Sequence, residues 1–322
     1  MLRWGILGTA RINGRLIPAF RAARRSTLMA VASRDRARAD AYAREWSVPR
    51  AFDGYQPLLD DPAIDAVYIP LPNSDHVPWT LAAIKAGKHV LCEKPLVLDP
   101  ADIDRIAGAA SEAGVVVEEG FMYRHEPLTA KALELIGGGA IGAVRALISG
   151  FTFALDAGTN IRLNPALGGG SLWDVGSYPV TYTQLIIGGA PQTVFGHAHW
   201  HASGVDDDFT GLLRFESGAT ANIYSGFRAA YRTWLEVIGS DAALTVPNPF
   251  RPGPLETLEL RRGGTIERID VTGSPEIFVR EVEDFEASVL DGTRPIVSLE
   301  ESRRTAATLT ALYASARTLY PQ

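Results

Sequence analysis

Residues 2–14 read LRWGILGTARING. The apolar run at 2–7 is typical of a short buried strand, and Gly8 follows it where a helical pattern begins. Further apolar runs occur at 28–32, 66–69, 89–92 and 115–117, with helical patterns at 37–46, 79–86 and 103–113 between most of them. Candidate N-caps precede the helical patterns, at Asp35, at Asn73 or Ser74, and at Asp99, and Gly87 and Gly114 follow two of them. This alternation predicts βαβ units and a parallel sheet.

The second part of the chain has a different pattern, with short segments in which apolar and polar residues alternate. These segments lie at 143–153, 193–202, 210–215, 219–225, 233–239 and 255–261, and helical patterns at 275–290 and 299–319 close the chain. We therefore predict an α/β protein of two domains. Residues 1–122 form an N-terminal Rossmann domain, and residues 123–322 form an α+β domain on a mostly antiparallel open sheet. An active site is expected in the cleft between the domains, outside the carboxyl ends of the parallel strands.

Composition excludes several classes of protein. The net charge is −6 and the arginines are scattered, so we expect no nucleic acid partner. No stretch approaches the roughly 18 uninterrupted apolar residues of a membrane helix, and no signal peptide precedes the first strand, which predicts a cytoplasmic protein. The single cysteine, Cys92, cannot form an intramolecular disulfide and is expected to be a small buried residue.

The turn after the first strand resembles a dinucleotide fingerprint, G-x-G-x-x-G or G-x-G-x-x-A, only in part. Gly8 permits the tight turn, Ala10 adds a methyl group where the backbone approaches a pyrophosphate, and Asn13 departs from the pattern where the helix packs closely. A tight turn without a ligand has the same sequence, but the position at the first βα turn favours a dinucleotide. The predicted cofactor contacts here are Gly8, Thr9, Ala10, Arg11 and Ile12.

The end of the second strand discriminates between the two nicotinamide cofactors, because an acid there accepts hydrogen bonds from the ribose 2′-hydroxyl and repels a 2′-phosphate. Ser33 and Arg34 follow this strand, Arg34 can pair with phosphate, and Asp35 is interpreted as the N-cap of the next helix. We therefore expect a preference for NADP(H). The alternative is that Arg34 is a solvated surface residue and that Asp35 binds the ribose of NAD.

Glu93-Lys94-Pro95 stands at the end of the strand predicted at 89–92. Three other segments have a characteristic order and spacing: PNSDH at 72–76, GFMYR at 120–124 and GGSLWDVGSY at 169–178. Together they resemble the glucose-fructose oxidoreductase, inositol dehydrogenase and MocA (Gfo/Idh/MocA) family over nearly the whole chain. Tyr178 stands where inositol dehydrogenases carry histidine, which makes the chain more similar to the glucose-fructose oxidoreductase, D-xylose dehydrogenase and dihydrodiol dehydrogenase branch.

The resemblance implies an NADP(H)-dependent oxidoreductase that transfers a hydride to or from a sugar, polyol or diol, and NAD remains a possible cofactor. It also implies a homodimer or homotetramer that assembles through the sheet of the second domain. Further cofactor contacts are implied for Pro70, Leu71, Asn73, His76, Glu93 and Lys94.

The expected catalytic residues are Lys94, Asp174 and Tyr178. Alcohol oxidation needs a group that takes the hydroxyl proton and a positive charge that stabilises the developing alkoxide. Tyr178 is the candidate acid and base, since a nearby ammonium lowers the pKa of a phenol from its usual value of about 10. Lys94 would supply that charge and bind the substrate hydroxyl, with Pro95 fixing the turn through either a trans or a cis peptide. Asp174 lies one helical turn before Tyr178 and would hold the substrate or Lys94.

Each of these residues also has a purely structural interpretation: a solvated turn for Lys94, a helix cap for Asp174 and a core side chain for Tyr178. Arg124 and Arg162 are candidate substrate residues or else ordinary surface or interdomain pairs. The histidines at 197, 199 and 201 share one face of a predicted strand, but side chains spaced by two along a strand diverge, so we expect no metal site.

Two other functions remain open. A non-catalytic NADP-binding regulator would bind the cofactor without turnover. A glycoside hydrolase assisted by tightly bound NAD would release a leaving group without net change in the cofactor.

Overall fold

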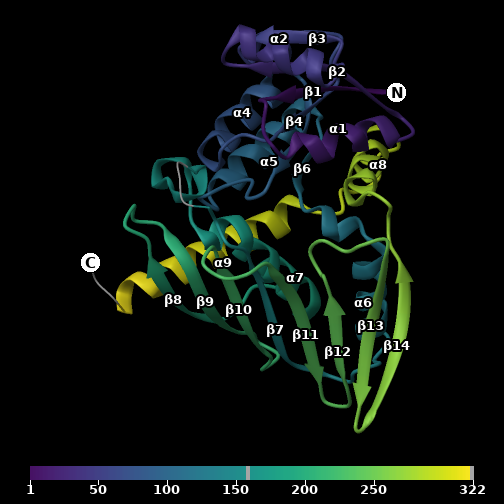
Figure 1. Ribbon diagram of the computed structural model, residues 1–322, viewed down its shortest axis with the longest axis vertical. Helices are drawn as coiled ribbons and strands as arrows, with labels where there is room; N and C mark the ends of the chain where they lie inside the picture. The colour runs from purple at the N-terminus through teal and green to yellow at the C-terminus, as the bar shows by residue number, and fades with distance from the viewer. Residues whose placement is uncertain (157–159, 320–322) are drawn as a thin grey trace. The chain divides into compact units, whose positions relative to one another are not determined.

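The computed structural model describes residues 1–156 and 160–319, and their contacts form two compact units (Figure 1). The first unit comprises Met1–Met122 and Phe278–Ser302, and the second comprises Tyr123–Ile277 and the chain from Arg303 onward. Residues 278–302 therefore pack with the first unit, although they lie in the range 123–322 that we assigned to the second domain. The two domain ranges, 1–122 and 123–322, stay predictions.

The first unit is built on a parallel sheet of six strands in the order β3-β2-β1-β4-β5-β6. The strands are β1 (Leu2–Leu7), β2 (Ser26–Ser33), β3 (Arg50–Asp53), β4 (Ala66–Ile69), β5 (His89–Glu93) and β6 (Val117–Gly120). Its helices are α1 (Asn13–Ala22), α2 (Arg36–Glu45), α3 (Gln56–Leu59), α4 (Asn73–Lys85), α5 (Asp102–Ala113) and α8 (Ile277–Leu290). This order is that of a Rossmann fold and confirms the predicted fold class.

Local signals explain where several of these elements begin and end. Asp35 caps α2 as predicted, because its Oδ1 accepts a hydrogen bond from the Arg38 amide at 2.7 Å. Gly114 ends α5 in the left-handed conformation, with φ of 65°. The Val115 amide then donates to Ala110, so β6 begins at Val117 instead of the predicted residue 115.

The second unit contains an eight-stranded sheet in the order β14-β13-β12-β11-β7-β10-β9-β8. The strands are β7 (Val144–Thr152), β8 (Thr193–Trp200), β9 (Asp206–Arg214), β10 (Thr220–Gly226), β11 (Arg232–Gly239), β12 (Ala243–Pro247), β13 (Leu255–Arg262) and β14 (Thr265–Thr272). Within the described residues of this sheet only β7 and β10 pair in parallel, which confirms a mostly antiparallel sheet.

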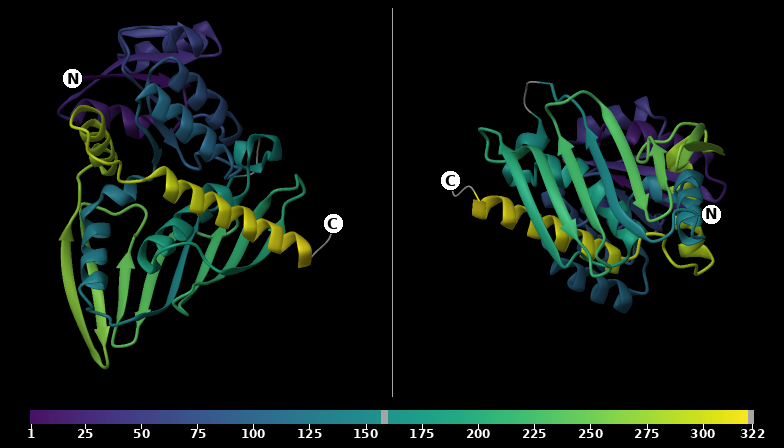
Figure 2. Two further views of the ribbon diagram at one scale, coloured as in Figure 1. Left: turned by 180° about the vertical axis from the view of Figure 1, so that it is seen from behind. Right: turned by 90° about the horizontal axis from the view of Figure 1, so that it is seen from below.

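The helices of the second unit pack against this sheet. They are α6 (Pro127–Gly137), α7 (Ser177–Ile187) and the part of α9 (Leu299–Leu319) that begins at Arg303. Helix α7 contacts β7 and β10, α6 contacts β12 and β14, and Leu312 of α9 reaches β8 and β9. In the right-hand view of Figure 2 the strands lie in front and α9 passes behind them. Among the described helices none combines the length and apolar character needed to cross a membrane.

Residues 278–302 are joined to the Rossmann sheet by apolar and polar contacts. Phe285 of α8 is fully buried, and its ring lies 5.1 Å from that of Trp4 in β1. The Val297 amide donates to Glu118 Oε1 at 2.9 Å, and Arg25 pairs with Asp291 at 2.8 Å. The core of the first unit therefore includes a segment that follows most of the second unit in the sequence.

We expect Phe285→Ala to lower the free energy of unfolding by about 3–5 kcal/mol, because it leaves a cavity beside Trp4. Chemical denaturation followed by tryptophan fluorescence measures this loss. The control is Leu290→Ala on the same helix, where the side chain is 42% exposed and the change should stay within about 0.5 kcal/mol. Equal effects of the two substitutions would contradict the assignment of α8 to this core.

Candidate active site

Asn13, the residue that departs from the fingerprint, is hydrogen-bonded to the glycine turn after β1. Gly8 has φ of 111°, and a Cβ there would lie 2.9 Å from Leu71 Cδ2. Asn13 is fully buried as the first residue of α1, and its Nδ2 donates to the Gly8 carbonyl at 3.0 Å. A side-chain hydrogen bond therefore fixes the helix against the turn at the position where the fingerprint has glycine or alanine.

The end of β2 has the polar character expected for a phosphate site. Ser33 is buried and its Oγ accepts from the Asp35 amide at 3.3 Å, whereas Arg34 is exposed. The Asp35 carboxylate caps α2, which agrees with the interpretation of this residue as an N-cap. Arg38, which was not predicted as a site residue, also lies at the glycine turn, because its guanidinium donates to the Thr9 carbonyl at 3.4 Å.

The Tyr55 hydroxyl lies 3.8 Å from a Cβ built on Gly8. Burial raises the pKa of Tyr55, and the charges of Arg34 and Arg38 oppose that rise. The alternation of arginine in SRDRAR, at 33–38, was the available signal for Arg38. By contrast, Arg36 points to its own helix, where its Nε pairs with Asp40 at 2.9 Å.

The turn Glu93-Lys94-Pro95 is held by two buried side chains, Tyr68 and Glu119. Tyr68 donates to Glu93 Oε1 at 2.6 Å, and the Leu96 amide donates to Glu119 Oε1 at 2.9 Å. The peptide between Lys94 and Pro95 is cis. Lys94 is half-buried and thus projects from a backbone that is fixed on both sides.

His76 connects this turn to the loop after β4. It is fully buried in α4, and its two ring nitrogens each lie 2.8 Å from a backbone carbonyl oxygen, that of Pro95 and that of Leu71. Burial lowers the pKa of His76, and the two backbone contacts oppose that shift. Both ring nitrogens therefore contact backbone. A direct contact between His76 and a cofactor stays a prediction.

The predicted cofactor residues of the first unit follow four neighbouring strands. Gly8 follows β1, Ser33 ends β2, Pro70 follows β4 and Lys94 follows β5. The order of these strands in the sheet is β2-β1-β4-β5. Because carboxyl ends of parallel strands meet at the same edge, the structure brings these segments together.

The glycine-rich segment of the second unit leads to Asp174 and Tyr178. Gly170 has φ of 119° and donates its amide to the Arg162 carbonyl at 2.9 Å. A π-helical turn, Leu172–Gly176, follows and runs directly into α7. The predicted one-turn spacing of Asp174 and Tyr178 therefore runs through a π-helical turn instead of a regular α-helix.

Two predicted substrate residues are brought together in this segment. Arg162 Nε lies 2.5 Å from Asp174 Oδ2, and their side chains are 39% and 15% exposed. Arg162 Cζ also lies 5.7 Å from the ring centre of Phe153. The pair places a positive and a negative group side by side at the start of α7.

Tyr178 is surrounded by aromatic rings and is 4% exposed. The ring centres of Phe250, Phe151 and Tyr123 lie 5.4, 5.5 and 5.9 Å from its own. These contacts fix the direction of its hydroxyl, and a purely structural tyrosine would have similar surroundings.

Arg124 lies in the 3₁₀ turn Met122–His125, near Tyr182 of α7. Burial raises the pKa of Tyr182 to about 12, and the charge of Arg124 opposes this rise. The histidines at 199 and 201 have separate partners. His199 Nδ1 contacts Asp207 Oδ1 at 2.6 Å, and His201 Nδ1 contacts Ser203 Oγ at 2.9 Å.

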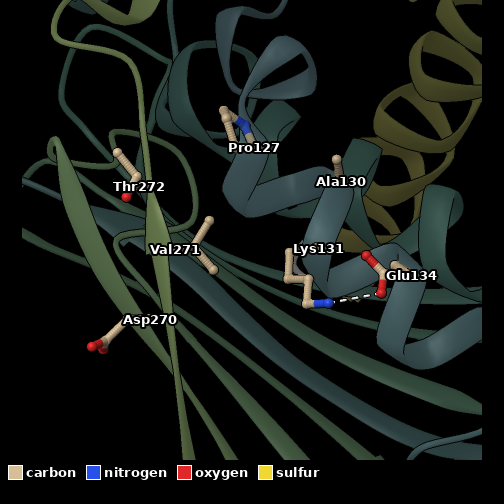
Figure 3. A pocket seen from close by; sticks show the side chains of 7 residues that line it. All are labelled: Pro127, Ala130, Lys131, Glu134, Asp270, Val271 and Thr272. Carbon is tan, nitrogen blue, oxygen red and sulfur yellow. Dashed lines mark hydrogen bonds and ion pairs between the residues drawn. The ribbon is translucent and has the colours of Figure 1, made fainter.

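A cavity of about 350 Å³ lies between α6 and β14 (Figure 3). It is lined by Pro127, Ala130, Lys131, Glu134, Asp270, Val271 and Thr272. Lys131 and Glu134 pair at 2.7 Å in this cavity. None of the predicted cofactor or substrate residues lines it, so it is not part of the candidate site.

Sequence comparisons match both parts of the chain to known families. Residues 2–121 match "Oxidoreductase family, NAD-binding Rossmann fold", and residues 129–245 match "GFO/IDH/MocA C-terminal domain". D-xylose 1-dehydrogenase (NADP(+)) 2 of Haloferax volcanii is 39% identical over 320 residues, which is 98% of each chain. A dTDP-3,4-didehydro-2,6-dideoxy-alpha-D-glucose 3-reductase of Streptomyces violaceoruber is 38% identical over 83% of this chain and 80% of its own.

A solved structure is similar over the whole length as well. KijD10, a 3-ketoreductase from Actinomadura kijaniata in complex with NADP and TDP-benzene, superposes with a TM-score of 0.92 at 30% identity. The match covers 98% of this chain and 97% of that one.

We expect Gly8→Ala to lower the free energy of unfolding by about 1–3 kcal/mol, because alanine rarely adopts a φ of 111° and its Cβ would press on Leu71. Thermal denaturation measures the change. Gly108→Ala in α5 is the matched control, since nothing lies within 4 Å and alanine favours a helix by about 0.5–1 kcal/mol. A Gly8→Ala protein as stable as the control would contradict the strained turn.

Proposed function

Because the chain belongs to the Gfo/Idh/MocA oxidoreductase family, we propose that it is an NADP(H)-dependent dehydrogenase of a sugar or related polyol. NAD(P)-dependent oxidation or reduction is the activity that the family assignment supports. The choice of NADP, the aldose-type substrate and the residue roles are our proposal. The observation that carries it is Lys94 at the end of β5, in a chain that also has Asp174 and Tyr178 and resembles a D-xylose dehydrogenase over its length.

The first unit fits a dinucleotide. Gly8 adopts a positive φ in a turn too crowded for a side chain, and α1 begins directly after this turn, where free amides favour a phosphate. When bound, the nicotinamide accepts or supplies the hydride. Thr9 to Ile12 would hold the pyrophosphate through the backbone, and Leu71, Asn73 and Glu93 lie at the adjacent strand ends.

NADP is favoured by the charges near β2. The Arg38 guanidinium donates to the Thr9 carbonyl at the glycine turn, and the charges of Arg34 and Arg38 both lower the pKa of Tyr55, which adjoins Gly8. A 2′-phosphate carries negative charge and accepts charge-assisted hydrogen bonds from arginine. Asp35 binds its own helix through Oδ1. This arrangement supports phosphate binding more than recognition of a free ribose hydroxyl.

In the proposed reaction the protein transfers one proton and supplies one positive charge. Tyr178 takes the hydroxyl proton of the substrate during oxidation and returns it during reduction. Lys94 donates a hydrogen bond to the same oxygen and stabilises the alkoxide. Asp174 and Arg162 bind neighbouring hydroxyls, and Arg124 is a further substrate contact in this proposal.

We also propose that the chain assembles as a homodimer or homotetramer through the eight-stranded sheet. Ile148 of β7 and Leu212 of β9 are 39% and 43% exposed, which is consistent with a partner on this sheet. Sedimentation velocity distinguishes these assemblies from a monomer.

We expect Tyr178→Phe to lower kcat by about a hundredfold with an aldose or diol, because the proton acceptor is lost, while NADPH binding is kept. Turnover is measured with a panel of aldoses and diols and both cofactors, starting with D-xylose. Tyr182→Phe is the control, since it removes a buried hydroxyl one turn further along α7 from the same aromatic cluster. Unchanged turnover in Tyr178→Phe excludes this phenol from the reaction. Binding of NADPH without turnover of any substrate would support the regulator.

We expect Arg34→Ala and Arg38→Ala each to weaken NADPH binding about tenfold and to leave NADH binding nearly unchanged, because each removes one charge-assisted contact to the 2′-phosphate. Quenching of tryptophan fluorescence reports both affinities without a substrate. Arg36→Ala is the matched control, since Arg36 pairs with Asp40. A wild-type protein that prefers NADH contradicts the cofactor proposal.

A further inference from the structure

Asp206, the first residue of β9, is a fully buried carboxylate that the proposed chemistry does not use. Its Oδ2 accepts hydrogen bonds from Ser171 Oγ at 2.6 Å and from the Leu172 amide at 2.8 Å. Its Oδ1 accepts a hydrogen bond from the hydroxyl of Tyr313 in α9. Burial raises the pKa of Asp206, and these donors oppose the rise.

The donors belong to the segment that leads to Asp174 and Tyr178. Ser171 and Leu172 stand at the start of the π-helical turn Leu172–Gly176, which continues into α7. Gly170 lies against the same carboxylate, because a Cβ at this position would collide with Asp206 Oδ1 and with the Tyr313 hydroxyl. The chain thus contacts this carboxylate at three successive residues, Gly170 to Leu172, where the turn begins.

Tyr313 contacts this segment a second time through its ring. The ring of Trp173 stacks on that of Tyr313, with centres 5.8 Å apart and planes at 30°. Trp173 directly precedes Asp174 in the π-helical turn. Tyr313 therefore connects Asp206 to Trp173, the residue beside Asp174.

Isolated π-helical turns are rare, and a buried carboxylate is unfavourable unless donors satisfy it. The π-helical turn and the buried carboxylate of Asp206 occur together here. The carboxylate stabilises the amino end of the turn, because it accepts hydrogen bonds from the Ser171 hydroxyl and the Leu172 amide. Because the turn runs directly into α7, it sets the direction in which α7 begins.

We propose that Asp206 is a positioning residue that, through Ser171, Leu172 and Tyr313, fixes the π-helical turn and thereby aims Asp174 and Tyr178. The catalytic consequence rests on the proposed function, whereas the anchoring of residues 170–178 does not. Asp206 itself touches neither substrate nor cofactor in this proposal.

Tyr313→Phe tests the proposal, because it removes one donor to Asp206 and keeps the ring that stacks on Trp173. We expect amide hydrogen exchange in residues 170–178 to rise about tenfold, and kcat to fall about tenfold with little change in KM. NADPH affinity should stay at the wild-type value. The pH profile of kcat/KM should shift, because a displaced Tyr178 has altered surroundings.

Tyr224→Phe is the matched control. Tyr224 is also half-buried, and its hydroxyl donates to the carboxylate of Asp208 at 2.8 Å, on the same strand β9. This variant loses a comparable hydrogen bond without touching residues 170–178, so exchange there, kcat and the pH profile should stay within about twofold of wild type. Ser171→Ala is a second test variant, which removes a different donor to Asp206 and should reproduce the effects of Tyr313→Phe.

Wild-type exchange in residues 170–178 of both test variants overturns the proposal, as does faster exchange with unchanged kcat and pH profile. Equal effects in Tyr224→Phe overturn it too, since they would mean that any loss of a tyrosine–aspartate bond in the sheet has the same result. If the wild-type protein binds NADPH but turns over no sugar or diol, the proposed function fails, and the exchange measurement still decides whether Asp206 anchors the turn.

Discussion

The parallel pairing of β2, β1, β4 and β5 is the constraint on which the cofactor side of this protein depends. Parallel strands end at the same edge, so short segments that are far apart in the sequence meet there without any long loop. His76 then joins two of these segments, because its ring lies between the carbonyls of Leu71 and Pro95. The position of Lys94 follows from sheet topology first and from local side-chain contacts second.

The mostly antiparallel sheet of the second unit offers no such common edge, and its proposed site residues are positioned by other means. Glycines in the segment 169–176 allow close approach, since a Cβ at Gly169 would lie 2.8 Å from the Arg162 carbonyl carbon and one at Gly176 would lie 2.8 Å from Leu172 Cδ1. Buried polar groups, such as the Asp206 carboxylate, then hold the backbone in the close arrangement that these glycines allow. In this unit the glycine-rich segment 169–176 therefore determines backbone conformation and packing as much as it supplies chemical groups.

Sequence patterns located β1, β4 and α9 at their observed residues, because strong apolar periodicity and clear breaks mark them. The strands β3, β12 and β14 were missed, since they are short or, like β14, mostly exposed and therefore lack a regular apolar face. The packing of α8 on Trp4, the π-helical turn and the contact of Arg38 with Thr9 depend on distant partners that no local pattern encodes. Lys94 and Tyr178 were predicted through resemblance, and their roles remain predictions.

The pairing of Arg162 with Asp174 bears on the class of substrate that the proposed function requires. A hydroxyl group is both donor and acceptor, so a polyol can donate to Asp174 and accept from Arg162 while the ion pair persists. A carboxylate substrate would compete with Asp174 for the guanidinium and would meet its negative charge. If Arg162 and Asp174 bind substrate as proposed, the pair favours hydroxyl-rich ligands over hydroxy acids. It does not select one sugar, because discrimination among sugars depends on a few contacts that family membership leaves unspecified.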